Sequence, residues 1–399
     1  MIESPDLQSD AIIAFARDLV AIPTENPPGA GYEQCVARIA EELEHLRISY
    51  EIVETGDEHT ARQTIVSHPA GEGSLLYLHG HYDVVPAFSP EQFAPRTELG
   101  RLTGRGSSDM KGGLAAIVYA AGAAAKAGAR VGLVIVPDEE TGGRLGSERL
   151  AELGLIDASA AGAIVAEPTW GTIWHACRGA FTLRVTVHGR AAHVGLHYDG
   201  SNAFTSATDL VQELRTLEHT LQSRESALTF GSPNPRARES IMLIGGVADG
   251  GTNFNIVPDR FSFTIDRRPN PDEDYDAARR ELLGLLDVAR TNGLNLEWEV
   301  LQDAVSAVTP PDHDFVDTVA TAIADVTGNR PLPTCCPGVL ETRIYSRLGI
   351  PAVAFGPGLI DKMHSPDEDV PAANLSAAAR IYAAIAKTFI DWSPARDGA

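Results

Sequence analysis

A run of apolar residues followed at once by polar ones is the clearest pattern in the chain. Residues 75–78 are apolar, and the segment His79–Asp83 that follows contains two histidines and an aspartate. A short apolar run of this kind predicts a buried strand. Because parallel strands of α/β folds present functional groups at their carboxyl ends, we interpret His81 and Asp83 as part of a site. A turn with a surface ion pair is the alternative for this stretch taken alone.

Two further apolar runs end in the same way. Residues 131–136 are followed by Glu139 and Glu140, and residues 163–166 by Glu167. Helix and strand patterns alternate with these runs, at residues 10–20, 32–46, 49–54, 63–67 and 114–125. This alternation predicts an α/β fold, with a mostly parallel sheet flanked by helices.

The pattern changes after residue 180. Apolar and polar residues alternate at 181–188 and again at 261–266, which indicates strands with one face in water. Helical patterns at residues 201–217 and 272–290 complete an inserted α+β domain, residues 181–300. The α/β pattern then returns, with a short helix after Glu341 and further elements at 314–326, 352–355 and 372–392. We therefore predict one discontinuous domain, residues 1–180 and 301–399, interrupted by the α+β domain.

Composition excludes several classes of protein. The net charge of −22 argues against nucleic-acid binding, which requires a basic face. No stretch approaches the roughly 20 apolar residues of a membrane helix, and residues 1–10 show no secretory signal. None of the four cysteines forms a Cys-x-x-Cys pair, which argues against a zinc finger or a disulfide scaffold. A reducing, cytoplasmic location is expected.

Ligand-type residues also occur away from the three strand ends. Asp109 lies between a glycine-rich loop and a predicted helix, and His364 follows the last predicted strand. The glycine-rich loop does not match a phosphate cradle, since Lys111 is followed by glycine. Each residue alone has an ordinary structural interpretation, such as helix capping. Together they would gather at one sheet edge, where so many carboxylates would repel one another without cations. Mixed histidine and carboxylate ligands suit Zn²⁺, Mn²⁺ or Co²⁺.

The chain resembles the dinuclear-zinc amidohydrolases and metallopeptidases, the family of acetylornithine deacetylase, succinyl-diaminopimelate desuccinylase, aminoacylases and glutamate-releasing carboxypeptidases. The resemblance covers nearly the whole chain and follows the family's order of motifs. These motifs are His79–Pro86, Gly104–Gly112, Asp138–Gly142, Ala166–Pro168, Gly189–His193, Asn255–Asp259 and His364. The resemblance implies a catalytic domain interrupted by a lid and dimerisation domain. The pattern of apolar and polar residues predicts the same arrangement.

The resemblance also implies the role of each site residue. His81 and Glu167 would hold one metal ion, Glu140 and His364 the other, and Asp109 would bridge both. Asp83 would orient His81, and Glu139 would be the general base. The ions are expected to be two Zn²⁺, with Co²⁺ or Mn²⁺ as alternatives.

The expected reaction is hydrolysis of the amide bond of an N-acyl amino acid. The second predicted function is a dipeptidase or carboxypeptidase that uses the same site. A non-enzymatic alternative is an inactive relative that binds a small ligand. Arg268, with Asn255 nearby, is a candidate for the substrate carboxylate, because a guanidinium matches a carboxylate in a bidentate way. Arg343 is a further candidate, from a loop at 336–343 that departs from the family pattern.

His193 is expected to serve the active site of a partner subunit. In relatives this histidine reaches across a dimer formed by the lid domains, so the resemblance implies a homodimer with shared sites. A surface histidine without a role is the alternative.

Overall fold

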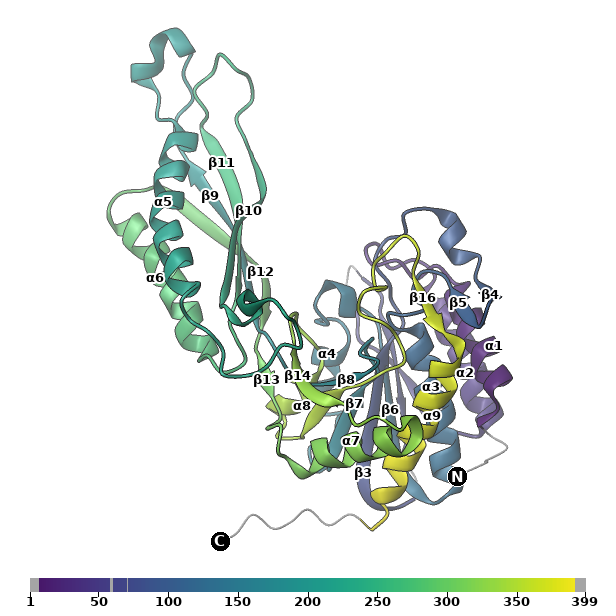
Figure 1. Ribbon diagram of the computed structural model, residues 1–399. Helices are drawn as coiled ribbons and strands as arrows, with labels where there is room; N and C mark the ends of the chain where they lie inside the picture. Colours follow the sequence, from purple (N-terminus) through teal and green to yellow (C-terminus); the bar gives the residue numbers. More distant parts are fainter. Residues whose placement is uncertain (1–6, 58–59, 70, 392–399) are drawn as a thin grey trace. The chain divides into compact units, whose positions relative to one another are not determined.

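The computed structural model describes residues 7–57, 60–69 and 71–391 (Figure 1). The chain divides into two compact units. The first comprises Met1–His175, Thr309–Thr334 and Glu341–Ala399, and the second comprises Ala176–Val308 and Cys335–Leu340. The sequence pattern does not indicate the second, short passage at residues 335–340.

The first unit is built on a mixed sheet with parallel strands at its centre. The central strands lie in the order β6 (Ala129–Val136), β3 (Glu72–His81), β7 (Gly162–Val165) and β15 (Ala352–Ala354), and neighbours among them are parallel. Antiparallel strands β2 (Gln63–Ser67) and β1 (Tyr50–Glu54) extend the sheet beyond β6. Beyond β15 the sheet continues through β8 (Thr172–Cys177), which pairs with β13 (Ala307–Val308) and β14 (Leu332–Cys336). The predicted α/β fold class is confirmed.

Helices cover both faces of this sheet. They are α1 (Ser9–Val20), α2 (Tyr32–Leu46), α3 (Lys111–Lys126), α4 (Ser147–Glu152), α7 (Asp314–Thr327), α8 (Thr342–Arg347) and α9 (Ala372–Thr388). α3 packs against β3 and β6 and is covered by α1 and α9, whereas α8 packs against β7 and β15. α9 is predicted to reach Trp392, but it ends at Thr388, and Trp392 lies outside the described residues.

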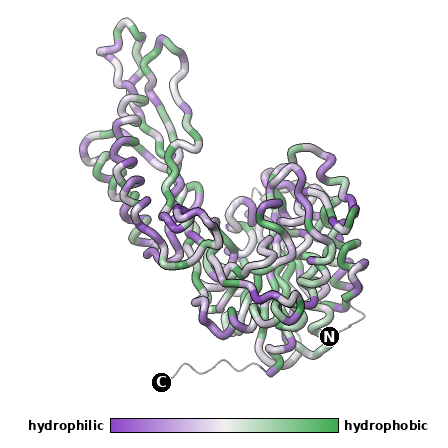
Figure 2. Tube along the Cα trace, viewed as in Figure 1, coloured by the Kyte–Doolittle hydropathy of each residue, from purple (hydrophilic) through white to green (hydrophobic). Residues whose placement is uncertain are grey.

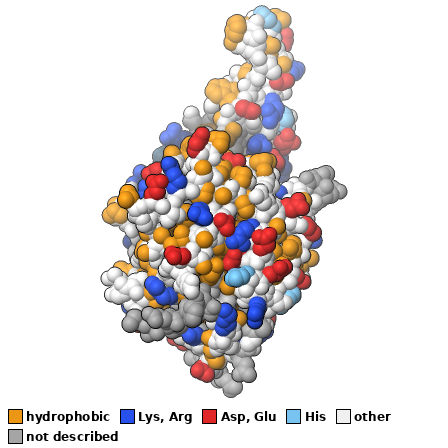
Figure 3. Space-filling model, turned by 90° about the vertical axis from the view of Figure 1, so that its right-hand side faces the viewer, with side chains coloured by type: hydrophobic (Ala, Val, Ile, Leu, Met, Phe, Trp, Pro, Cys, Tyr) orange, Lys and Arg blue, Asp and Glu red, His pale blue; other side chains and the backbone are white. Residues whose placement is uncertain are grey.

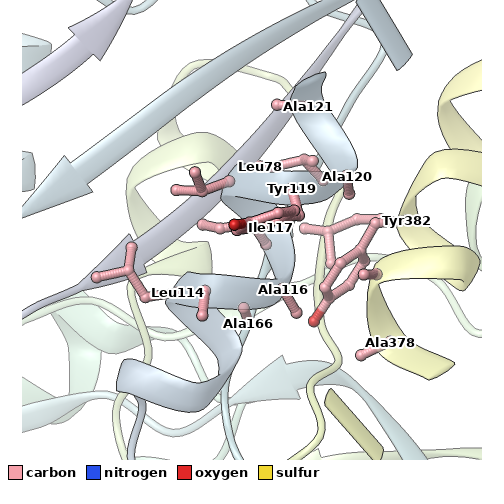
Figure 4. Packing of buried hydrophobic residues seen from close by; sticks show 14 of the residues in the cluster. Leu78, Leu114, Ala116, Ile117, Tyr119, Ala120, Ala121, Ala166, Ala378 and Tyr382 are labelled. Atoms are coloured by element: carbon pink, nitrogen blue, oxygen red, sulfur yellow. The ribbon is translucent and has the colours of Figure 1, made fainter. Parts of the chain in front are cut away.

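The alternation of side chains along β3 explains this two-sided packing. Leu76 and Leu78 are fully buried in the core that α3 and α9 complete. Figure 4 shows Leu78 near Ile117 of α3 and Tyr382 of α9. Tyr77 and His79 point to the other face, where their rings lie 5.8 and 5.6 Å from that of Tyr345 in α8. His81 then ends the strand, at the carboxyl edge of the parallel strands.

The second unit is an α+β structure. Its antiparallel sheet has the order β10 (Ile241–Gly250), β11 (Arg260–Arg268), β9 (Ala180–His188) and β12 (Leu296–Ala304). The alternating apolar residues of β9 are buried against α5 (Ala203–Leu221) and α6 (Tyr275–Thr291). In Figure 2 both helices alternate hydrophilic and hydrophobic residues along their length, as helices with one buried side do.

A small third sheet lies in the first unit. β5 (Arg101–Thr103) pairs with β4 (Arg96–Glu98) on one side and with β16 (Asp369–Pro371) on the other. It therefore joins the segment before Asp109 to the segment after His364.

Charged side chains of both signs are interspersed on the face of the molecule in Figure 3. Among residues 7–57, 60–69 and 71–391, no helix is both long and apolar enough to cross a membrane.

Candidate metal centre

Five side chains of the first unit form two adjoining clusters of metal-ligand type. One consists of His81, Asp109 and Glu167, and the other of Asp109, Glu140 and His364. Within each cluster the potential ligand atoms all lie within 4.8 Å of one another. Asp109 belongs to both: its Oδ1 lies 3.3 Å from Nε2 of His81, and its Oδ2 lies 3.1 Å from Nε2 of His364. One carboxylate thus faces both clusters with a different oxygen.

The parallel strands explain why residues distant in sequence meet here. His81 is the last residue of β3, and Glu167 follows β7 directly alongside it. Glu139 and Glu140 lie in a short 3₁₀ turn, η3 (Glu139–Thr141), after β6. All three strands end at the same edge of the sheet, which is where open α/β sheets bind ligands.

His81 is held so that one ring nitrogen faces the cluster. Its Nδ1 lies 3.0 Å from the carbonyl oxygen of Asp83 and 3.3 Å from Oδ1 of the same residue. Its Nε2 is buried without a hydrogen-bond partner in the described part of the chain, and so is Oε1 of Glu167. Unpaired buried polar atoms are costly unless a ligand satisfies them. These two atoms and the donor types around them therefore fit a divalent cation.

The carboxylate of Asp83 also accepts hydrogen bonds that the sequence does not predict. Its Oδ1 accepts the backbone N–H of Glu139 and its Oδ2 that of Glu140, both at 3.2 Å. Oδ2 also accepts a hydrogen bond of 2.9 Å from the side-chain amide of Asn26. Asp83 therefore orients both His81 and the turn that carries the two glutamates.

The carboxyl groups of the centre carry strongly shifted pKa values. Burial raises the pKa of Glu167 to about 8, and the charge of Asp109 adds to this shift. Burial also raises the pKa values of Glu139 and Glu140 above their usual range. For Asp109, burial is outweighed by the two neighbouring histidines, His364 and His81, which lower its pKa. A cation would relieve the repulsion among these groups and displace their protons.

Glu139 lies beside the clusters without belonging to either. Its Oε2 is 3.9 Å from Nε2 of His81, and its side chain is 18% exposed. Glu140, one residue on, contacts His364 through Oε2 at 3.3 Å. The tight turn thus aims the two neighbouring glutamates differently.

Arg343, a predicted substrate ligand, is buried, and one of its guanidinium nitrogens, Nη2, contacts neighbouring groups of the chain. Its side chain is 2% exposed, with Nη2 at 3.1 Å from Oε1 of Glu148. The same Nη2 donates to the carbonyl oxygen of Gly142 at 2.7 Å. The side chain of Arg343 therefore contacts the end of the glutamate turn.

Glu341 packs under the same turn. Its carboxylate accepts hydrogen bonds from Ser147 and His79, and it is 2% exposed. The sequence pattern contains no signal for Glu341 itself, although its partner His79 lies two residues before His81.

Three further predicted residues lie in the second unit. Nδ1 of His193 accepts the backbone N–H of Gly195 at 3.1 Å, so its Nε2 is left to act as a donor. The carbonyl oxygen of Asn255 accepts the N–H of Val194 at 2.9 Å, which places Asn255 beside His193. Arg268 lies farther along the unit, at the end of β11, and donates to both carboxylate oxygens of Asp266, at 2.9 and 3.0 Å.

Comparison with known proteins identifies the family. The model of peptidase family M20/M25/M40 matches residues 77–388. This chain is a member of that family. The match spans all five residues of the two clusters and the whole second unit.

Relatives and solved structures agree with this membership. A Mycobacterium tuberculosis protein named as a candidate succinyl-diaminopimelate desuccinylase, DapE, is 29% identical over 378 residues, covering 94% of this chain and 97% of that protein. The M20 metallo-carboxypeptidase Sso-CP2 of Sulfolobus solfataricus superimposes with a TM-score of 0.75 at 16% identity, covering 95% and 99% of the two chains. The dipeptidase Dug1p of Saccharomyces cerevisiae gives a TM-score of 0.74 at 17% identity, covering 98% of each chain.

The membership settles the class of activity. The chain is a metal-dependent hydrolase of amide bonds that acts on small molecules. The reading as an inactive relative has no support in the site, because the ligand-type residues of both clusters are present.

Proposed function

We propose that this M20-family enzyme hydrolyses the amide bond of an N-acyl amino acid, releasing the amino acid and a carboxylic acid. The observation that carries the proposal is the pair of clusters sharing Asp109, with Glu139 free beside them. Two ligand sets with one common carboxylate suit a two-metal hydrolytic site.

The ligand assignment follows the geometry of the clusters. His81 and Glu167 would hold one ion, Glu140 and His364 the other, and Asp109 both. Zn²⁺ is the proposed ion, because imidazole and carboxylate together form its usual ligand set. Bound there, two divalent ions would polarise the scissile carbonyl and acidify the attacking water.

Glu139 is the proposed general base. It would take a proton from the attacking water and pass it to the leaving nitrogen. Burial raises its pKa above the usual range of a glutamate, a shift that is frequent at functional sites. Asp83 supports this role by holding the backbone N–H of Glu139.

The second unit would supply the substrate contacts. Arg268 and Asn255 are proposed to bind the substrate carboxylate, which requires Arg268 to exchange its contact with Asp266 for the substrate. His193, with Nε2 available as a donor, would stabilise the oxyanion of the tetrahedral intermediate.

We further propose a homodimer formed by the second units, each supplying His193 to its partner. Edge strand β10 exposes the apolar side chains of Ile241, Leu243 and Val247, at 40%, 55% and 60%. An exposed apolar edge strand is a surface that proteins cover. A second copy of the chain would cover it.

The cytoplasmic location stays a prediction.

A peptidase is the second candidate. It is favoured by the two solved peptidases of the same fold, the carboxypeptidase Sso-CP2 and the dipeptidase Dug1p. The desuccinylase-named relative has the higher identity over nearly the whole chain and favours the deacylase.

A substrate panel decides between the two. The Zn²⁺-loaded enzyme would be assayed for amine release from matched N-acetyl and N-succinyl amino acids and from dipeptides with the same carboxyl-terminal residue. The deacylase proposal expects kcat/KM to be highest for an N-acyl substrate. Higher values for the dipeptides would establish the peptidase, and no amine release from any of them would refute both.

A further inference from the structure

Glu368 connects the two segments that carry Asp109 and His364. Its Oε1 accepts the backbone N–H groups of both Ser108 and Asp109, each at 3.0 Å. Its own backbone carbonyl accepts the N–H of Gly104 at 3.0 Å. Glu368 therefore holds the segment before α3 by its side chain and by its main chain.

The other carboxylate oxygen of Glu368 binds an arginine. Nη1 of Arg105 lies 2.5 Å from Oε2 of Glu368, and both residues are 1% exposed. Fully buried ion pairs contribute little net stability, because desolvation offsets most of the attraction. Stability alone is therefore a poor explanation for burying a charge pair directly beside a site already rich in carboxylates.

Further contacts hold the segment that carries His364. Oγ of Ser108 accepts the N–H of Leu359 at 2.7 Å and lies 3.1 Å from the carbonyl oxygen of that residue. The side-chain amide of Gln92 donates to the carbonyl oxygens of Ser365 and Pro366, both at 3.2 Å. Between these contacts lies His364, whose backbone has a φ of 58°, a region that residues other than glycine rarely occupy. The segment is held in a conformation it would not adopt alone.

We propose that the Arg105–Glu368 pair is a positioning device for the metal centre. Glu368 fixes the main chain of Asp109, and through residues 364–368 it sets His364 at the distance needed to share an ion with Asp109. The inference rests on the proposed two-metal site. In this proposal Glu368 contacts neither metal nor substrate. It controls the positions of Asp109 and His364, which bind the metal.

The experiment measures metal binding directly. Apo-protein would be titrated with Zn²⁺ in competition with a chromophoric chelator, for wild type, Glu368→Ala, Glu368→Gln and Asp367→Asn. Asp367 is the matched control, because it is the neighbouring carboxylate but is 76% exposed and paired with Lys362. Its removal reports the effect of lost negative charge without loss of the contacts to Ser108 and Asp109.

The expected result is a graded loss of affinity. Removing groups that orient metal ligands typically weakens binding about 10–100-fold. Glu368→Ala is expected to show such a loss for at least one of two ions. Glu368→Gln, whose amide oxygen can still accept the N–H of Asp109, is expected to lose less, and Asp367→Asn to bind as wild type. In Co²⁺-loaded protein the visible absorption bands, which report coordination geometry, should change in the alanine variant and, to a smaller extent, in the glutamine variant.

Opposite results would overturn the inference. Wild-type Zn²⁺ affinity and an unchanged Co²⁺ spectrum in Glu368→Ala would show that Glu368 does not position the ligands, and so would an equal loss in Asp367→Asn. Should the alanine variant fail to fold, Glu368→Gln, which keeps the volume of the side chain, decides by the same two measurements. Failure of the wild-type protein to bind two ions would instead count against the proposed function.

Discussion

At the scale of single residues, the neighbours Glu139 and Glu140 differ in what they contact. Glu140 belongs to a ligand cluster, whereas Glu139 stands beside both clusters. We expect Glu139→Gln to keep both metal ions and to lower kcat by about 10²–10⁴, the usual cost of losing a general acid–base group. Glu140→Gln should instead release one ion. Metal analysis after gel filtration, together with steady-state rates, separates the two, and normal turnover in Glu139→Gln would remove it from the mechanism.

The two arginines proposed from the sequence should also differ in which kinetic constant their replacement changes. Arg268 is half-buried in the second unit, and its replacement by alanine should raise KM. Arg343 is buried against Gly142, so Arg343→Met should lower kcat through the glutamate turn and leave KM nearly unchanged. The exposed Arg347, in the same helix, provides the control Arg347→Met. A rise in KM as the main effect of Arg343→Met would return Arg343 to the substrate site.

The sequence predicted the ligand-type residues because each stands at the end of an apolar run or beside a glycine-rich loop. It could not predict Asn26, Glu341 or Glu368, whose importance comes from hydrogen bonds to groups far away in the chain. The sequence also did not predict that Arg343 is buried, because the residues around an arginine in a loop do not identify the groups that its side chain contacts. Pairings of this kind are created by the tertiary fold.

At the scale of elements, the turn that carries Glu139 depends on Gly143. This glycine has a φ of +72°, and a Cβ atom there would lie 2.8 Å from Oε1 of Glu341. Gly154 has nearly the same φ, +70°, but open space around it. Gly154→Ala should therefore cost only the backbone strain, about 1–2 kcal/mol of unfolding free energy.

Gly143→Ala should cost more stability than Gly154→Ala and should also lower kcat, because the clash moves the turn. Chemical denaturation and rate measurements on both variants test this comparison. Equal stability and full activity in the two variants would show that the turn tolerates displacement.

Most elements were predictable from periodicity, and the misses have a physical cause. α2 and β2 have the predicted bounds. β10 was missed because most of its residues are exposed and it contains glycines, so it lacks the alternation of a half-buried strand. β8 was missed because its residues are nearly all buried, which removes any alternation.

At the scale of the whole molecule, the charge of the metal-free centre should make stability depend on pH. The folded protein raises the pKa of Glu167 to about 8 through burial, and that of His364 to about 10 through its hydrogen bonds with Asp109 and Glu140. Both groups bind protons more tightly in the folded state, so their contribution is lost as pH rises. The Tm of the apo-protein should fall from pH 6.5 towards pH 10.

Adding Zn²⁺ should reverse this trend, since ligands that bind the folded state stabilise it, by about 2.7 kcal/mol at 100 times Kd. Thermal unfolding at several pH values, with chelator or with Zn²⁺, provides the measurement. Activity should disappear with the chelator and return with Zn²⁺, Co²⁺ or Mn²⁺. A flat pH profile in the apo-protein, or full activity without metal, would contradict the proposed centre.

Subunit exchange tests the proposed sharing of sites. Glu139→Gln and His193→Ala should each be inactive, the second by about 10²–10³ for one lost oxyanion donor. If His193 acts in the partner subunit, mixed dimers regain one complete site, with Glu139 from one chain and His193 from the other. Absence of recovery after demonstrated exchange would place His193 in the site of its own chain or outside catalysis.

The position of β15 has a consequence for how the protein is made. Strand β15 pairs with β7, yet the whole α+β unit is encoded between them. At a synthesis rate of about 5–20 residues per second, the ribosome needs roughly 10–40 s to travel from β7 to β15. During that interval β7 has an open edge, and Glu140 and Asp109 lack His364. The second ligand cluster is thus assembled only after the inserted unit has emerged, so full metal loading must be one of the last steps of its biogenesis.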